Sequence, residues 1–185
     1  MPAIISINDN NILIQHRDTV VSSQGYALIL DDEVLFDFDE DRAAINSCRF
    51  TPQQIQNRYW QQCAQTSIST NNTEVRTSAD LIWRHLSSMR ESFDLDQVVF
   101  VVPSHYQQDN LQLLLGIANS AGLTPKGLVN KAVLASQHQA KQDGDYFHID
   151  LQLHQTVCSL VEVRQGVAKL SDIDIVNEVL SLIHI

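Results

Sequence analysis

Along the last third of the chain, polar residues recur at every second position: His148, Asp150, Gln152 and His154. On a β-strand such residues share one face, and two imidazoles with one carboxylate can bind a transition metal. The side chains between them are apolar and would form the opposite face of an amphipathic strand; they are Phe147, Ile149, Leu151 and Leu153. Because no further ligand stands nearby in the sequence, we favour a polar face in contact with solvent and predict no metal site.

An acidic repeat imitates the start of a calcium-binding loop: Asp37, Asp39 and Asp41. An EF-hand would need a glycine and later a glutamate, and this chain has Arg42 and Cys48 at those positions. We therefore interpret the repeat as a charged edge or turn.

Ser104 and His105 pair a nucleophile type with a base type, but neighbours on a chain rarely meet in those roles. The sequence also lacks the Gly-x-Ser-x-Gly elbow that exposes a hydrolase serine. We predict instead that Ser104 caps the helix that follows it, in a capping box with Gln107.

The cysteines and tryptophans are given structural roles. Cys48, Cys63 and Cys158 form no CxxC pair, which disfavours a zinc or thioredoxin-type site and indicates reduced, mostly buried thiols. Trp60 and Trp83 fall in expected helices, where packing is the usual role. Trp60, which is followed by two glutamines, is also a candidate anchor for a partner protein.

Hydrophobic patterns predict the elements that position these residues. Short β-branched runs at 4–7 and 12–14 predict a hairpin, and 26–30 with 34–38 predict a second pair of strands. Helices are predicted from Pro52, with Ile55, Tyr59 and Cys63 on one face, and from Ser78.

The second half of the chain alternates strands and helices before it returns to β-structure. The continuous apolar run 97–102 predicts a buried parallel strand, followed by a helix, a short strand at 128–129 and a helix over 131–140. Strands are expected again at 146–153, 156–163 and 167–170. This order predicts an α/β fold with a parallel sheet.

Four segments occur in the order and at the separations of one known family. They are VVFVVPSHY at 98–106, IANSAGL at 117–123, NKAVLA at 130–135 and DLQLHQTV at 150–157. Through these segments the chain, from Ala79 to Val163, resembles the nucleotide-binding domain of DnaK-type heat-shock chaperones, within the actin-like ATPase superfamily. The resemblance implies a ribonuclease H-like, actin-like ATPase lobe: a mixed sheet with flanking helices.

The resemblance also implies a division of the chain. Residues 1–143 would form the first lobe, and 144–185 the β-rich start of a second lobe that is apparently incomplete. We therefore expect either a fragment of a longer protein or a domain completed by a partner. The segment Leu180–Ile185 is apolar enough to need burial in either case.

The departures from the family concern its phosphate loops, in which glycines let backbone amides approach the nucleotide. Here the glycine triplet is replaced by Gln152, Leu153 and His154, and the phosphate-contacting threonine by Gln155. Two further losses accompany these: the first phosphate loop becomes the glycine-free stretch 8–11, and the acid that orients water and metal becomes a lysine, Lys131.

Together these departures predict a pseudo-ATPase that needs no cofactor, has no catalytic residue and acts through a protein partner or self-association. The alternative is a divergent ATP-binding protein that uses magnesium, with Asp150 near the nucleotide phosphates. In that alternative Asp9 would stand for the aspartate of the first loop.

The charge of the chain excludes some classes of binding partner. The chain has 185 residues with 22 acids against 12 bases, so its net charge of −10 repels nucleic acid and anionic membrane. Its start lacks the basic and apolar segments of a signal peptide, and its apolar runs are too short to span a bilayer. We expect a cytoplasmic protein that binds neither nucleic acid nor membrane.

Overall fold

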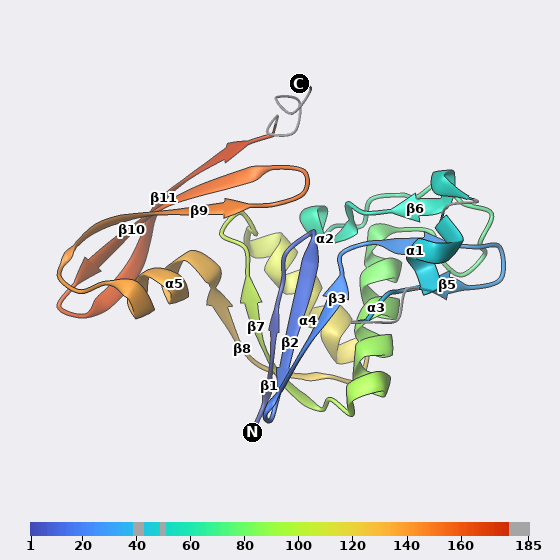
Figure 1. The fold of residues 1–185 in the computed structure, drawn as a ribbon, viewed down its shortest axis with the longest axis horizontal. Helices are drawn as coiled ribbons and strands as arrows, with labels where there is room; N and C mark the ends of the chain where they lie inside the picture. The colour runs from blue at the N-terminus through green and yellow to red at the C-terminus, as the bar shows by residue number, and fades with distance from the viewer. Residues whose placement is uncertain (39–42, 49–50, 178–185) are drawn as a thin grey trace.

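The computed structural model describes residues 1–38, 43–48 and 51–177 (Figure 1). Its main sheet has five strands in the order β3-β2-β1-β7-β8. Their bounds are β1 Ala3–Ser6, β2 Asn11–His16, β3 Thr19–Gln24, β7 Gln97–Val102 and β8 Thr124–Asn130. The first three strands are antiparallel, whereas β7 runs parallel to both β1 and β8, so the sheet is mixed. The first predicted hairpin and the parallel strand are thus confirmed.

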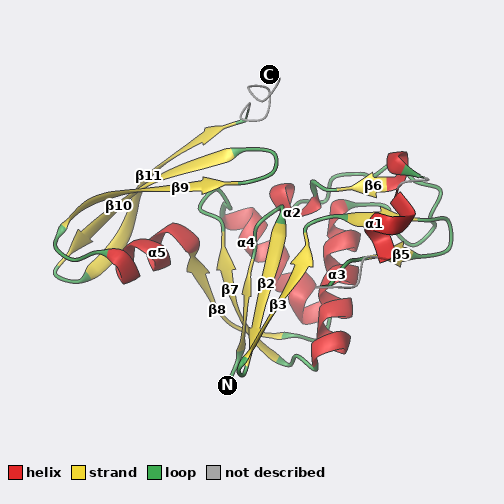
Figure 2. Ribbon diagram, viewed as in Figure 1, coloured by secondary structure: helices red, strands yellow, loops and turns green. Residues whose placement is uncertain are grey.

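The two long helices are α3 (Ser78–Phe93) and α4 (Gln108–Ser120), which pack on the sheet in the main hydrophobic core (Figure 2). The helix predicted from Ser78 is confirmed, and five residues at helical spacing on its inward side are buried: Leu81, Ile82, His85, Leu86 and Met89. A capping box between Thr77 and Asp80 satisfies amides at the start of α3.

The start of α4 differs from the prediction. Gln107, not Ser104, is the N-cap, and it forms a capping box with Asn110. Ser104 instead donates from Oγ to Oδ1 of Asn130 at 3.1 Å. Gly122, just beyond the end of α4, takes a φ of +78°, which glycine adopts without strain.

The predicted helix from Pro52 is wrong. The chain forms one 3-10 turn (Pro52–Gln54), then β6 (Ile55–Gln56) and the short helix α2 (Tyr59–Gln62). Tertiary pairing overrides the helical pattern, because Ile55 lies opposite Leu28 of β4 (Ala27–Ile29). The other edge of β4 pairs with β5 (Val34–Leu35), as the second predicted pair requires, and α1 (Ala43–Cys48) packs beside β4.

A second, antiparallel sheet of three strands follows in the order β11-β10-β9. Its strands are β9 Gly144–Leu151, β10 Thr156–Arg164 and β11 Val167–Val176. Helix α5 (Lys131–Gln139) lies against its inward face, where Ala132, Val161 and Val163 form a small core of their own. Figure 1 shows this sheet projecting beyond the first one. The apolar segment Leu180–Ile185 lies outside the described residues.

The chain is therefore an α/β protein in which helices flank a mixed sheet. Among the described residues, none of the helices has the length and apolar character needed to cross a lipid bilayer.

Candidate functional site

Asp9 lies in the turn between β1 and β2 and is almost fully buried, with 1% of its surface exposed. Its carboxylate accepts two backbone hydrogen bonds from the turn between β9 and β10: Leu153 N at 2.7 Å on Oδ1 and His154 N at 3.2 Å on Oδ2. One carboxylate thus accepts hydrogen bonds from two consecutive amides of a turn that is more than 140 residues away along the chain. We call this pair of amides, Leu153 N and His154 N, the amide cradle.

Gly25 explains how the turn of Asp9 reaches this position. A Cβ added at Gly25 would lie 1.8 Å from the backbone carbonyl oxygen of Asp9, so only glycine allows the approach. The amide of Gly25 also donates to the carbonyl of Asn10 at 3.0 Å. The close packing of the two segments therefore depends on Gly25, because the turn 8–11 itself contains no glycine.

Asp150, near the end of β9, is the second buried carboxylate of this junction. Its Oδ1 accepts from Lys131 Nζ at 2.6 Å and from Asn8 Nδ2 at 3.4 Å, and its Oδ2 accepts from Gln152 Nε2 at 2.9 Å. Lys131 is the first residue of α5, whose amides are capped by the side chain of Asn130. The charge of Asp150 is thus neutralised by an ammonium group from the same chain.

Glutamine side chains extend this network toward α2. Gln155 donates to Oε1 of Gln152 at 2.8 Å and accepts from Gln61 at 3.1 Å. The ring of His105 lies beside a carbonyl acceptor, Gln61 O, at 3.1 Å from Nε2, so the proton belongs on Nε2 and Nδ1 accepts from Gln155. Burial lowers the pKa of His105, which favours the neutral form of the ring.

The predicted faces of β9 are the wrong way round. The apolar face is the exposed one, with Phe147 at 78%, Ile149 at 61% and Leu151 at 69%, whereas Asp150 and Gln152 are buried. The polar face points inward because it completes the junction with the turn of Asp9, which the local pattern cannot reveal. Among the described residues, no group of three or more His, Cys, Asp or Glu side chains is placed to hold a metal ion.

The two histidines of the alternating pattern, His148 and His154, lie in different surroundings. His154 is within 3.1 Å of the carbonyl of Asn57 through Nε2. His148 is partly buried, and burial lowers its pKa.

A cluster that the sequence analysis missed surrounds His85, which is fully buried on α3. The indole of Trp60 donates to its Nδ1 at 3.0 Å, and because an indole can only donate, the proton must be on Nε2. Nε2 then donates to Ser23 Oγ at 2.6 Å, which donates to the carbonyl of Asp37 at 2.9 Å. Burial lowers the pKa of His85 to about 3. With no exposure to solvent, this serine–histidine pair is part of the core.

The same cluster tests the roles predicted for Trp60 and for the acidic repeat that begins at Asp37. Trp60 is buried, so its suggested role as a surface anchor for a partner is wrong; Trp83 is 41% exposed. Asp37 is also buried and accepts from Tyr26 and from the amide of Ala44. The other acids of its repeat, Asp39 and Asp41, lie outside the described residues.

The described cysteines carry free thiols, and burial raises the pKa of Cys63 to about 12. Cys63 is buried and Cys158 half-buried, as expected for reduced structural thiols. Cys48 contributes backbone to α1, but its side chain is not among the described groups.

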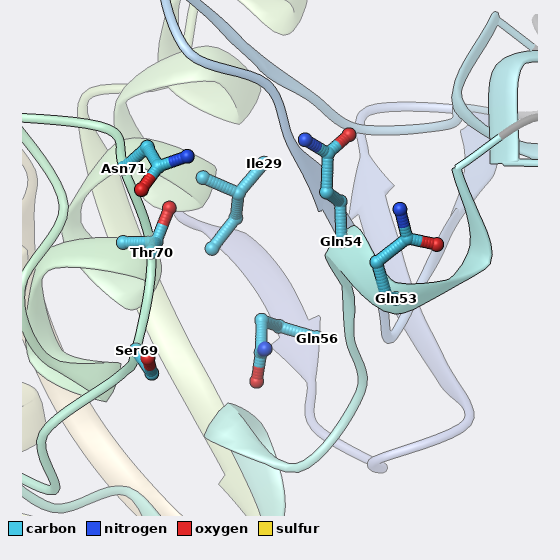
Figure 3. A pocket seen from close by; sticks show the side chains of 7 residues that line it. All are labelled: Ile29, Gln53, Gln54, Gln56, Ser69, Thr70 and Asn71. Atoms are coloured by element: carbon cyan, nitrogen blue, oxygen red, sulfur yellow. The ribbon is translucent and has the colours of Figure 1, made fainter.

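A pocket of about 300 Å³ opens elsewhere, between the 53–56 segment and the 69–71 loop (Figure 3). Its lining is amide and hydroxyl with a single apolar residue: Ile29, Gln53, Gln54, Gln56, Ser69, Thr70 and Asn71. Without an ionisable side chain in its lining, the pocket offers neither a general acid or base nor a charged partner for phosphate. The junction of Asp9 and Asp150 is therefore the stronger candidate site.

Comparison with known proteins finds no family model that matches the chain and no significantly similar curated protein.

Proposed function

We propose that this chain is a non-catalytic domain of the ribonuclease H-like, actin-like ATPase type, which acts through contacts with a protein partner. Its strand order supports this architecture: an antiparallel meander, β1 to β3, is extended by two parallel strands on the side of β1. The two stretches that stand in place of the family's phosphate loops also meet in space, because the turn after Asp150 contacts the turn after β1.

The observation that carries the proposal is the bond between Asp9 and the amide cradle. In ATPases of this type, turns at these places bind phosphate through backbone amides that are free to donate to it. Here a buried carboxylate already accepts from both amides. A nucleotide phosphate would have to displace Asp9 and would also meet its negative charge.

Magnesium meets a similar obstacle at Asp150. A carboxylate binds Mg²⁺ through free oxygen lone pairs, together with water and substrate phosphates. Both oxygens of Asp150 accept hydrogen bonds, and the ammonium of Lys131 lies 2.6 Å from one of them. Neither ATP nor magnesium therefore fits the residues present, and we propose that the domain uses neither.

A thermal unfolding scan with and without magnesium-ATP, repeated with magnesium-ADP, tests this proposal. A ligand at a hundredfold its dissociation constant adds about 2.7 kcal/mol of stability, or roughly 5 to 10 °C in Tm for a chain of this size. We expect no shift.

A rise of that size would contradict the proposal and favour the divergent ATP-binding protein, with Asp150 beside the phosphates. In that case Asp150→Asn should abolish the shift, while Asp18→Asn, which changes an exposed acid on the β2–β3 turn, should leave it unchanged.

A further inference from the structure

The polar pocket beside β4 and β6 is separate from the junction of Asp9 and Asp150. Figure 1 shows β5 and β6 at the opposite end of the molecule from the sheet of β9 to β11. None of the residues that line the pocket belongs to the junction. The pocket therefore needs an explanation of its own.

One wall of the pocket is the segment 53–56, whose backbone is held by the small sheet. Strand β6 pairs with β4, with Ile55 opposite Leu28. The 3-10 turn before β6 is closed by a hydrogen bond from the amide of Gln54 to the carbonyl of Thr51 at 3.0 Å. This wall is thus fixed by backbone pairing.

The opposite wall is the loop 69–71, which Asn72 fixes. Asn72 is 5% exposed, and its Nδ2 donates to the carbonyl of Leu30 at 2.8 Å. Its Oδ1 accepts from two amides further along the loop, at 2.9 and 3.2 Å. The amide of Asn72 donates to Oγ1 of Thr70 at 3.1 Å, so the hydroxyl of Thr70 can still donate its own hydrogen. Because both walls are held by the fold, a ligand would not have to order the backbone.

The polar side chains of the lining, in contrast, have few partners in the protein. Within the part of the chain that the structure describes, several of them form no hydrogen bond with another residue: Gln53, Gln54, Gln56, Ser69 and Asn71. Figure 3 shows the amides of Gln54 and Asn71 on opposite sides of Ile29. These side chains are available to bind a ligand from both walls.

Gln54 gives the most specific indication of the chemistry. Its Oε1 is buried, and no described group donates to it. A buried acceptor without a donor is unfavourable, so a rotation of the amide toward a donor inside the pocket would stabilise the side chain. A hydroxyl group can both donate and accept, and it can therefore pair with either end of the amide.

The composition of the lining selects the class of ligand. None of the described residues that line the pocket is ionisable, so a phosphate, carboxylate or amine would find no counter-ion there. The net charge of −10 disfavours anions further. Ile29 is the single apolar residue of the lining, which contains no aromatic ring, and this disfavours apolar and flat aromatic ligands. What remains is a neutral molecule with many groups that donate and accept.

We propose that this pocket binds a neutral, hydroxyl-rich small molecule of the size and chemistry of a monosaccharide. The amides of Gln54 and Gln56 bind its hydroxyls from the side of β6. Thr70 and Asn71 bind from the loop, and Ile29 contacts the carbon skeleton. A volume of about 300 Å³ lies at the lower end of the range for small-molecule pockets, which suits a single sugar ring. This site goes beyond the proposed function, because it gives the domain a small-molecule ligand in addition to a protein partner.

Proton–nitrogen correlation NMR during titration tests the inference, with glucose, galactose, mannose, ribose and myo-inositol as probes. At least one probe should shift the backbone signals of 53–56 and 69–71 saturably, with a dissociation constant in the millimolar range or tighter. The side-chain NH₂ signals of Gln54 and Gln56 should shift in the same titration.

Variants that keep side-chain size but remove hydrogen bonds test the contacts. Gln54→Met/Gln56→Met should bind the responding probe at least about tenfold more weakly than wild type. Asn71→Leu, on the other wall, should weaken it several-fold and is an independent test. Gln15→Met/Gln112→Met is the matched control, because it replaces two exposed glutamines of β2 and α4, outside the pocket. It should bind as wild type does. The remaining backbone signals show in each case that the variant is folded.

Charged and aromatic analogues test the class of ligand. Phosphorylated and amino-substituted forms of the responding probe should bind no more tightly than the neutral form, and adenine and uracil should cause no shift. The proposal would be overturned by the absence of a saturable shift with every neutral probe up to about 50 mM, by tighter binding of a charged or aromatic analogue, or by wild-type affinity in both pocket variants. The result is independent of the magnesium-ATP scan, since the pocket and the junction share no residue.

Discussion

Among single residues, Asp9 is the one whose local sequence says least about its role. It stands in a polar turn, 8–11, and its place in the structure depends on two amides 144 and 145 residues away. A turn acid is an ordinary expectation for such a segment. Its partners become visible only when the two turns are placed against each other, which is why the sequence could name Asp9 as a candidate but could not supply its acceptor role.

Asp9→Asn should lower the free energy of unfolding by about 1–3 kcal/mol. The asparagine keeps one oxygen, so one amide of the cradle would face an NH₂ group and lose its acceptor. Urea denaturation measures the change. Asp18→Asn removes an exposed charge and should leave stability within about 0.5 kcal/mol of wild type. Equal stability of the two variants would contradict the role of Asp9.

His85 makes the protein less stable in acid. Its pKa is about 3 in the folded state, against about 6.5 when unfolded, so between these values the unfolded chain binds the extra proton. Stability from this residue is complete above pH 6.5 and falls by about 1.4 kcal/mol per pH unit from there toward pH 3. Denaturation curves across this range for wild type and His85→Gln should differ in slope by that amount. Parallel pH profiles would show that His85 can be protonated in the fold.

At the scale of elements, prediction succeeded where one face of an element is set by its own neighbours. Helix α3 follows from the spacing of Leu81, Leu86 and Met89, and β7 from its continuous apolar run. The helix predicted from Pro52 does not form, because Ile55 pairs with β4 and Cys63 adopts a left-handed φ of +38° that ends α2. The faces of β9 were assigned the wrong way round for the same reason: a long-range contact outweighs the local pattern.

The turn of Asp9 also depends on close packing against another element. Gly25→Ala should cost about 2 kcal/mol or more, because the added Cβ would meet the carbonyl of Asp9 at 1.8 Å. Gly116→Ala is the matched substitution: it lies within α4 with no atom near the new Cβ, and it should add about 0.5–1 kcal/mol. Thermal or urea denaturation of both variants measures these changes in stability. A stable Gly25→Ala protein would show that the turn can move away without penalty.

For the whole molecule, a mixed sheet with flanking helices was predicted and is observed, but the relation between the two sheets could not be predicted. The main core joins the first sheet to α3 and α4, while the second sheet shares a separate small core with α5. What joins the two regions at the candidate site is polar: Asp9 with the amide cradle, and Asn8 with Asp150. Such contacts are directional and depend on exact register, so hydrophobic patterning carries no signal of them.

This arrangement predicts that the second sheet opens before the first. Hydrogen exchange should be about tenfold or more faster in the central amides of β10, which has partners on both sides, than in those of β1 and β7, because the smaller core protects them less. In Asp9→Asn, exchange should rise in β9 to β11 and also in β1 and β7, because opening of either region breaks the weakened link, while β10 should remain faster than β1 and β7. Exchange mass spectrometry of both proteins resolves these segments. If all strands exchanged together in wild type and variant alike, the two cores would form one cooperative unit, and Asp9 would contribute to its stability as a whole.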